Sequence, residues 1–416
     1  MSKLPYKLTE KMHIRLLALL GWIVCFASYI TRLNFAAVLV EFIQAEGVMK
    51  SAASVIITTM LITHGVGQLL SGYLGDRVAP RHLIFFGLFV AAVCNLLLPL
   101  FSPSIAAMAV IWGVNGIAQA MLWPPLLKIC ANALSSEDYN RLVPVIDSSC
   151  ASATIAVYLF SPLIITLSGW KQVFYIASAL ATVVAVVWFL TTGSLLKNVS
   201  FTSNKEKKSI SENGKKGNRA VLKLLPCILL SAAMLGVLKD GITTWMPTFI
   251  SETFKMKSTE SILSTVVIPA SHMLIGLSTY RVLKAMKRDV FAAISLYFTI
   301  TAGFLLLLWC SGTNSMVLST LFIALGSGGL HGINALSTYY LPELLGGTER
   351  ISFYAGLLNA AIFVGSALST FLFAVISEAL GWNITVIFWV IFAFIGLALM
   401  LISMVVARKK GNAGSV

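Results

Sequence analysis

Long apolar stretches separated by short polar segments run through the whole chain. Each has roughly the 20 residues that a helix needs to cross a bilayer. Only the segment 196–222 is a long polar interruption, in which Lys, Ser and Asn predominate without apolar periodicity. We therefore predict two six-helix halves, 1–195 and 223–416, joined by a basic cytoplasmic linker. The twelve predicted membrane-spanning helices cover 14–40, 52–75, 82–101, 104–132, 142–167, 172–195, 223–250, 259–280, 289–310, 315–341, 351–379 and 384–407.

Composition supports an all-α integral membrane protein, because 58% of residues are hydrophobic and only 11% are charged. The net charge of +14 has a topological explanation. Of the 30 Lys and Arg residues, 23 fall on the side that holds both predicted termini and the linker. The positive-inside rule then predicts cytoplasmic termini, a location in the cell membrane and no role in nucleic-acid binding.

Two basic side chains, Arg32 and Lys239, lie deep inside apolar stretches, one in each half. A cation at mid-membrane costs about 2.5 to 3.5 kcal/mol even on the milder insertion scales, so it persists where it faces a cavity or a partner. This placement predicts a binding site for an anion. Asp147 and Asp240 are the only carboxylates well inside the predicted spans, and either is a counter-ion or a proton carrier.

The two halves repeat one another at a nearly constant offset. His64 and His272 are 208 residues apart, and Gly169-Trp170 matches Gly381-Trp382 at 212. A duplicated six-helix unit explains both offsets. The two histidines either carry a coupling proton or hydrogen-bond to a neighbouring helix.

The loop after the second predicted span reads Gly-Tyr-Leu-Gly-Asp-Arg-Val-Ala-Pro-Arg-His over 72–82. It resembles the G-x-L-x-D-R-x-G-x-R-R loop of the major facilitator superfamily, with Ala79 in place of the second glycine. The resemblance implies that fold and a cytoplasmic gate loop. Asp76, Arg77 and Arg81 form a latch between helices or, alternatively, are only positive-inside charges.

Three further segments narrow the resemblance: 29–35 (YITRLNF), 115–125 (NGIAQAMLWPP) and 239–248 (KDGITTWMPT). Together they look like the organophosphate:phosphate antiporter family. The resemblance implies that basic residues of the first and seventh helices, here Arg32 and Lys239, bind the substrate phosphate. The chain departs from the family in having no second basic residue after the first-helix arginine, and no histidine on the fifth helix. Further candidates for the pocket are Tyr29, Trp123, Trp245 and Asn334, for which helix packing is the alternative to substrate contact.

We therefore expect a secondary active transporter that works by alternating access, with a central anion site between two pseudo-symmetric bundles. The expected substrate is an organophosphate exchanged for inorganic phosphate. A proton-coupled symporter of a carboxylate or sugar acid is the first alternative, and a non-transporting membrane sensor of a phosphorylated metabolite is the second. We expect a bacterial inner-membrane protein that functions as a monomer, with no enzymatic activity, metal or cofactor, because no catalytic or ligand cluster is present.

Overall fold

The computed structural model describes residues 8, 10–74, 78–197, 199, 222–311, 315–346 and 351–412, and the described regular structure is helical throughout. The residues separate into two compact units. Unit 1 comprises Met1–Val48 and Val55–Ile210, and unit 2 comprises Met49–Ser54 and Ser211–Val416. Nearly all of the predicted linker 196–222 lies outside the described residues, so the domain boundaries inferred from the sequence stay a prediction.

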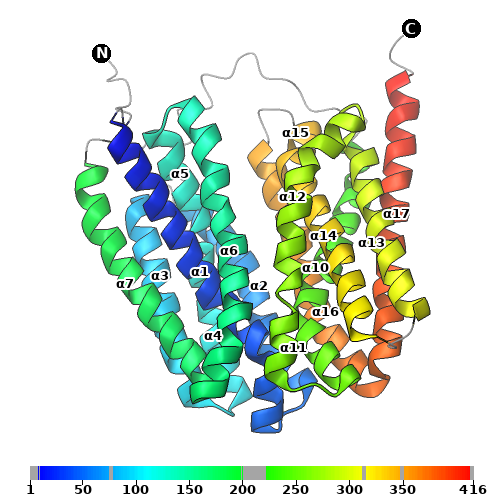
Figure 1. Ribbon diagram of the computed structural model, residues 1–416. Coiled ribbons are helices and arrows are strands. Elements are labelled where there is room, and N and C mark those ends of the chain that lie inside the picture. The colour runs from blue at the N-terminus through cyan, green and yellow to red at the C-terminus, as the bar shows by residue number, and fades with distance from the viewer. Residues whose placement is uncertain are drawn as a thin grey trace. The chain divides into compact units, whose positions relative to one another are not determined.

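Unit 1 is a helical bundle in which α1 packs against α6 and α7, and α3 packs against α4 and α7 (Figure 1). The fourth predicted span consists of two helices, because Trp123-Pro124-Pro125 begins a new helix after a turn at 121–122. Proline lacks the amide hydrogen for a continuing helix but suits a first turn. The elements are α1 (Lys11–Glu46), α2 (Lys50–Leu74, from Val55 on), α3 (Pro80–Leu97), η1 (Leu98–Phe101), α4 (Ile105–Ala120), α5 (Trp123–Ala133), α6 (Ser136–Ser168) and α7 (Lys171–Leu195).

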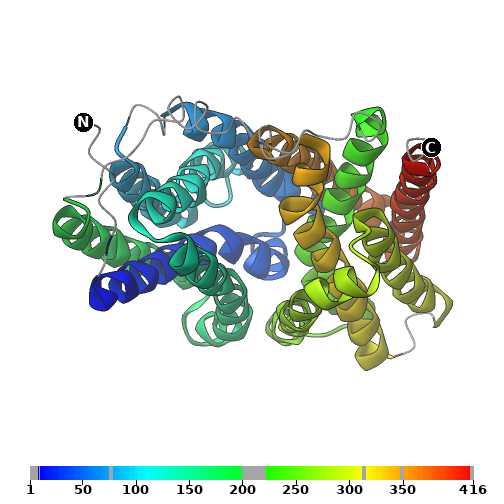
Figure 2. The ribbon, with the colours of Figure 1, turned by 90° about the horizontal axis from the view of Figure 1, so that it is seen from above.

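Unit 2 repeats this plan with its own helices, which Figure 2 shows end-on. Here α10 packs against α16 and α17, and α13 packs against α14 and α17, the same pairings as in unit 1. The elements are α10 (Leu225–Phe254), α11 (Ser258–Ser264), α12 (Val267–Ala285), α13 (Val290–Ser311), α14 (Met316–Tyr339), α15 (Leu341–Gly346), α16 (Ile351–Ala379) and α17 (Gly381–Asn412).

The glycines of the repeated Gly-Trp pair explain how the chain turns from α6 into α7 in unit 1 and from α16 into α17 in unit 2. Gly169 has φ +84° and Gly381 has φ +79°, and residues that carry a Cβ atom rarely adopt this backbone conformation. The tryptophans that follow, Trp170 and Trp382, are both buried. The duplication inferred from the 212-residue spacing therefore has a structural counterpart in backbone conformation and in packing.

The first turn of α2 belongs to unit 2, whereas the rest of the helix belongs to unit 1. Lys50 Nζ lies 2.8 Å from Glu252 Oε2, and Trp382 Nε1 donates to the same oxygen at 2.7 Å. The Lys50 ammonium also lies 5.1 Å from the centroid of the Trp382 ring. This cation is only 8% exposed, so one carboxylate and one aromatic face take the place of its lost hydration.

Within the described residues each predicted span is largely helical, although 104–132 and 259–280 each consist of two helices, and the fold class is confirmed. In the described part of the chain, ten helices are long and apolar enough to cross a membrane, or eleven if a bent pair within 258–285 counts as one span. Helix α2 occupies the remaining predicted span and is not among them. Large apolar side chains such as Leu163 and Leu190 are mostly exposed on the bundle surface, as lipid-facing positions require.

Candidate functional sites in the two units

In unit 1, Arg32 lies on α1 beside a group of side chains from α1 and α6. The Arg32 Cζ atom is 5.7 Å from the centroid of the Tyr29 ring, within reach of a cation–π interaction. Tyr29 also hydrogen-bonds to Cys150, whose thiol is 3.9 Å from Asp147 Oδ1. Arg32 and Asp147 both interact electrostatically with Tyr29 and Cys150. We call these four residues the α1 half-site.

A network of buried amides fixes the backbone next to Arg32. The carbonyl oxygen of Thr31, which belongs to the peptide group joining Thr31 to Arg32, accepts hydrogen bonds from Asn95 Nδ2 at 3.0 Å and Asn115 Nδ2 at 3.1 Å. Close by, the amide of Phe35 donates to the side chain of Asn34 at 2.9 Å. Helices α3 and α4 therefore hold the peptide plane from which the guanidinium extends.

The Thr31 hydroxyl belongs to the same network. It accepts a hydrogen bond from Gln119 Nε2 at 2.9 Å, and Gln119 Oε1 accepts one from the Ser28 hydroxyl at 2.6 Å. Asn34 Nδ2 donates to Asn95 Oδ1 at 2.6 Å. Sequence reasoning picked out the Asn-Gly and Gln positions of α4 but gave them no role, and it missed Asn95. A lone amide in the apolar run 82–101 was the available signal.

In unit 2, Lys239 and Asp240 lie on α10, and Asp240 is held by the neighbouring α16. Lys239 Nζ is 3.6 Å from Asp240 Oδ1, whereas the Ser366 hydroxyl donates to Asp240 Oδ2 at 2.5 Å. The same hydroxyl contacts the Gly236 carbonyl at 3.3 Å, one turn earlier on α10. We call Lys239, Asp240 and Ser366 the α10 half-site. Its carboxylate acts as a nearby counter-ion, and its ammonium makes no hydrogen bond within the described residues.

Two histidines lie near Lys239 in the same unit. His272 on α12 and His331 on α14 stack with ring centroids 4.9 Å apart, and both interact electrostatically with Lys239. Asn334 lies three residues after His331 and is only partly buried. His64 has a different environment, because its Nδ1 atom pairs with the Gly116 carbonyl at 3.2 Å and joins α2 to α4.

The family follows from comparison with known proteins. A model of the Major Facilitator Superfamily matches residues 21–350. The chain belongs to this superfamily. It superimposes with a TM-score of 0.78 on the crystal structure of a bacterial homolog to the human lysosomal transporter Spinster, at 11% identity over 96% of this chain and 99% of that one. That likeness establishes the fold alone.

The curated relatives are membrane transporters and a sensor. The chain is 24% identical to the glycerol-3-phosphate transporter of Bacillus subtilis over 89% of its own length and 88% of the relative's. It is 24% identical to a probable hexose phosphate transport protein of Chlamydia trachomatis over 38% and 35%. It is 34% identical to the membrane sensor protein UhpC of Escherichia coli over 30% and 26%. These relatives agree with the organophosphate:phosphate antiporter family, and the protein is a multi-pass membrane transporter rather than an enzyme.

The superfamily loop is only partly visible. Asp76 and Arg77 lie outside the described residues. Arg81 is the second residue of α3 and donates from Nε to the His82 ring at 3.2 Å, while its carbonyl accepts from Trp188 Nε1 on α7 at 3.0 Å. The latch therefore stays a prediction.

Two of the aromatic candidates lie in helix contacts. Trp245 is fully buried and donates from Nε1 to the Thr370 carbonyl on α16 at 3.0 Å. Trp123 is partly buried and packs against the apolar core of unit 1. For both, the structure favours the packing role that the sequence left open, whereas Tyr29 stays beside Arg32.

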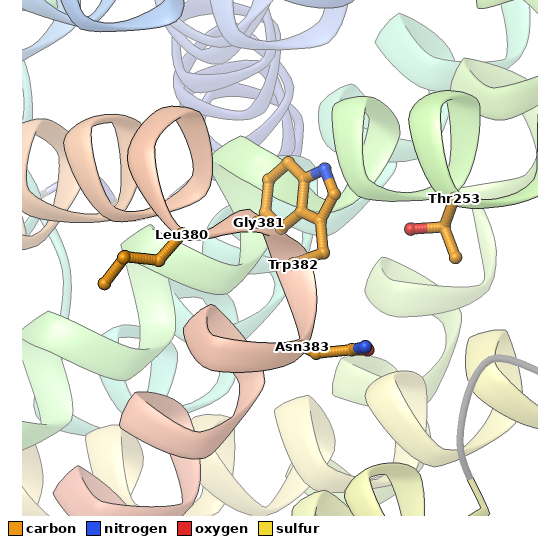
Figure 3. A pocket seen from close by; sticks show the side chains of 5 residues that line it. All are labelled: Thr253, Leu380, Gly381, Trp382 and Asn383. Carbon is orange, nitrogen blue, oxygen red and sulfur yellow. The ribbon is translucent and has the colours of Figure 1, made fainter.

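A pocket of about 230 Å³ lies at the end of α10 and the start of α17 in unit 2 (Figure 3). It is lined by Thr253, Leu380, Gly381, Trp382 and Asn383. On α10 it is about 20 Å along the helix from Lys239, given a rise of ~1.5 Å per residue. The pocket is therefore separate from the α10 half-site. Among the described residues, no three His, Cys, Asp or Glu side chains come together as metal ligands do.

Proposed function

We propose that the protein carries a small organophosphate across the bacterial plasma membrane in exchange for inorganic phosphate. The observation that carries the proposal is the environment of Lys239. Its ammonium is mostly buried, yet its only ionic partner in the described part of the chain is the adjacent Asp240 at 3.6 Å. Ser366 holds that carboxylate on its other oxygen. A cation that is desolvated but incompletely paired favours an anionic ligand.

Arg32 is the second proposed contact. A guanidinium can bind two phosphate oxygens at once, and its orientation is supported by the Tyr29 ring and by the amide network at Thr31. Arg32 lies 14 residues before the end of α1, and Lys239 lies 15 residues before the end of α10. The two cations thus occupy equivalent places in the repeat. Relatives named for glycerol-3-phosphate and hexose phosphate support a phosphate monoester as the substrate.

The remaining assignments follow from these two contacts. Asn334 and Tyr29 contribute polar contacts to the substrate, and Asp240 is the counter-ion in the empty state. Asp147 is the exposed carboxylate of the α1 half-site and serves as counter-ion or proton carrier there. The loop residues Asp76, Arg77 and Arg81 form the cytoplasmic latch, both termini are cytoplasmic, and the monomer is the functional unit.

Proteoliposomes loaded with inorganic phosphate test the proposal. We expect them to accumulate labelled glycerol 3-phosphate or a hexose phosphate, while vesicles without internal phosphate do not. Lys239→Met keeps the length of the side chain but removes the charge and should abolish exchange, whereas Lys239→Arg should retain it. Failure of every sugar and glycerol phosphate in the panel to exchange would refute the proposal.

A sensor is the second candidate, since the relative UhpC is a membrane sensor and is 34% identical over the matched 125 residues. A sensor binds the ligand without moving it. Ligand-dependent thermal stabilisation of purified protein, together with an absence of flux in the same preparation, would favour this candidate. Rapid exchange in the proteoliposomes would exclude it.

A further inference from the structure

The histidine pair of unit 2 has features that helix packing alone does not require. The rings of His272 and His331 are nearly parallel, with an angle of 9° between their planes and 4.9 Å between their centroids. His272 Nε2 pairs with the Ser327 hydroxyl at 2.8 Å. Ser327, His331 and Asn334 are spaced at i, i+4 and i+7, so they lie on one face of α14.

This face is left with unused hydrogen-bonding groups. His331 and Asn334 are only partly buried. Neither side chain has a hydrogen-bond partner within the described residues. The described side chains whose polar atoms are both inaccessible and without a partner do not include His331 or Asn334. Their polar atoms therefore border accessible space. Two open donors or acceptors one turn apart, near a lysine, are suited to the oxygens of an anion.

The charged and titratable groups around the pair are few. From α10 come Lys239, which interacts electrostatically with both rings, and its neighbour Asp240. From α13 comes Tyr297, whose ring lies against Gly332 and whose hydroxyl is 3.4 Å from the Ser278 hydroxyl on α12. The neighbour Asp240 is itself bound by the uncharged Ser366 on α16. Lys239 is thus the main charge that acts on the two rings.

Charge balance suggests what the pair does. Two imidazolium rings at this separation would repel each other, so the pair holds at most one proton. In the empty protein Lys239 and Asp240 offset one another. A phosphate monoester brings two negative charges that the Lys239–Asp240 pair does not offset, and a net charge left inside a membrane is costly.

We propose that His272 and His331 form a subsite that takes up one proton from water when a dianionic phosphate ester binds beside Lys239. The proton adds to the lone pair of a ring nitrogen of His331, and the resulting N–H donates to a phosphate oxygen. His272, held by Ser327, stacks on the charged ring. The inference rests on the proposed function and adds a substrate charge state and a coupled proton to it.

Isothermal titration calorimetry measures the proton directly. Glycerol 3-phosphate is titrated at pH 7.5, where an ester with a second pKa of about 6 is mainly dianionic, into purified protein in two buffers of different ionisation enthalpy. The difference in heat gives the protons bound. We expect about one proton per ligand in the wild type and close to none in His331→Asn, with binding retained but weakened.

The matched control is His64→Asn, because His64 is also a membrane histidine but pairs with a backbone carbonyl on α4. It should keep the full proton uptake. Uptake that disappears in His64→Asn and persists in His331→Asn would overturn the inference. If the wild type binds glycerol 3-phosphate without any proton uptake, the inferred subsite is overturned, whatever the variants do. The proposed function would then remain intact. A complete absence of binding by any phosphate would instead refute the proposed function and, with it, the subsite.

Discussion

Replacing Asn115 with leucine tests whether the amide network of unit 1 serves the position of Arg32. The substitution keeps the number of side-chain heavy atoms but removes the donor that reaches the Thr31 carbonyl at 3.1 Å and the acceptor that Gln119 Nε2 reaches at 3.4 Å within α4. Asn95 still donates to that carbonyl at 3.0 Å, so no buried acceptor is left without a partner. The expected effect is the net value of one hydrogen bond between helices, together with the freedom that the Arg32 peptide gains.

The magnitude follows from measurements on comparable bonds. A hydrogen bond between membrane helices contributes about 0.6 kcal/mol on average and about 1.7 kcal/mol at most. If the loss acts on ligand binding, the dissociation constant for glycerol 3-phosphate rises about three- to twentyfold, since 1.36 kcal/mol is about a factor of ten. In the double variant Asn95→Leu/Asn115→Leu the Thr31 carbonyl loses both side-chain donors, whereas each single variant leaves one, so the double effect should exceed the sum of the single ones.

Calorimetric affinity and thermal unfolding are measured together on each variant. Asn132→Leu serves as the control, because Asn132 is also a buried amide of unit 1. Its Nδ2 atom donates at 2.7 Å to the backbone carbonyl of Lys128, which belongs to the same helix. We expect it to lower the unfolding temperature with less than a twofold change in affinity. The reasoning fails if Asn115→Leu changes affinity no more than this control does at a similar loss of stability, since the network would then be structural only.

Three further predictions, made with four substitutions, test unit 2. Gly365→Ala places a methyl group against a backbone carbonyl of α10 and should destabilise the protein by about 1 to 3 kcal/mol, whereas Gly303→Ala, with nothing within 4 Å, should be neutral or stabilising in thermal unfolding. Glu252→Gln leaves Lys50 poorly paired and should cost about 1 to 3 kcal/mol, less than a fully buried pair because the carboxylate is 37% exposed; equal melting temperatures would contradict this. Ser366→Ala frees the carboxylate of Asp240 to neutralise Lys239 and should weaken phosphate binding about three- to tenfold, an effect of about 1 kcal/mol for one lost hydrogen bond. An unchanged affinity for phosphate would refute this prediction.

The architecture could be predicted because length and hydropathy determine which segments cross a membrane. The duplication was equally visible, since Gly169 and Gly381 each allow a backbone turn that other residues resist. The break between α4 and α5 was less accessible, although Pro124 and Pro125 mark it. A hydropathy window averages over such a turn, so the fourth span was predicted as one continuous helix.

The site was predicted less completely, for a physical reason. A membrane helix is apolar on all sides, so its sequence does not indicate which face meets a neighbour and which faces a cavity. Trp245 and Tyr29 gave the same signal, yet Trp245 donates to a backbone carbonyl of α16 and Tyr29 lies beside Arg32. Charged residues were better guides, because the cost of burying them is high whichever way the helix turns. Partners such as Ser366 and Asn95 depend on contacts across helices that no local pattern encodes.

The two half-sites hold their cations by different means, and the difference has consequences for recognition. Around Arg32, neutral amides on the peptide group and an aromatic ring restrict the direction of a planar guanidinium, while the carboxylate of the half-site, Asp147, is exposed. Around Lys239 the support is a carboxylate, which reduces the effective charge of a flexible ammonium but leaves its direction free. The α1 half-site is thus suited to fix the orientation of a phosphate. The α10 half-site, with titratable rings nearby, is suited to adjust the total charge to that of the ligand. Changes near Arg32 should therefore alter discrimination between phosphate and flat carboxylates, whereas changes near Lys239 should alter the pH dependence of binding.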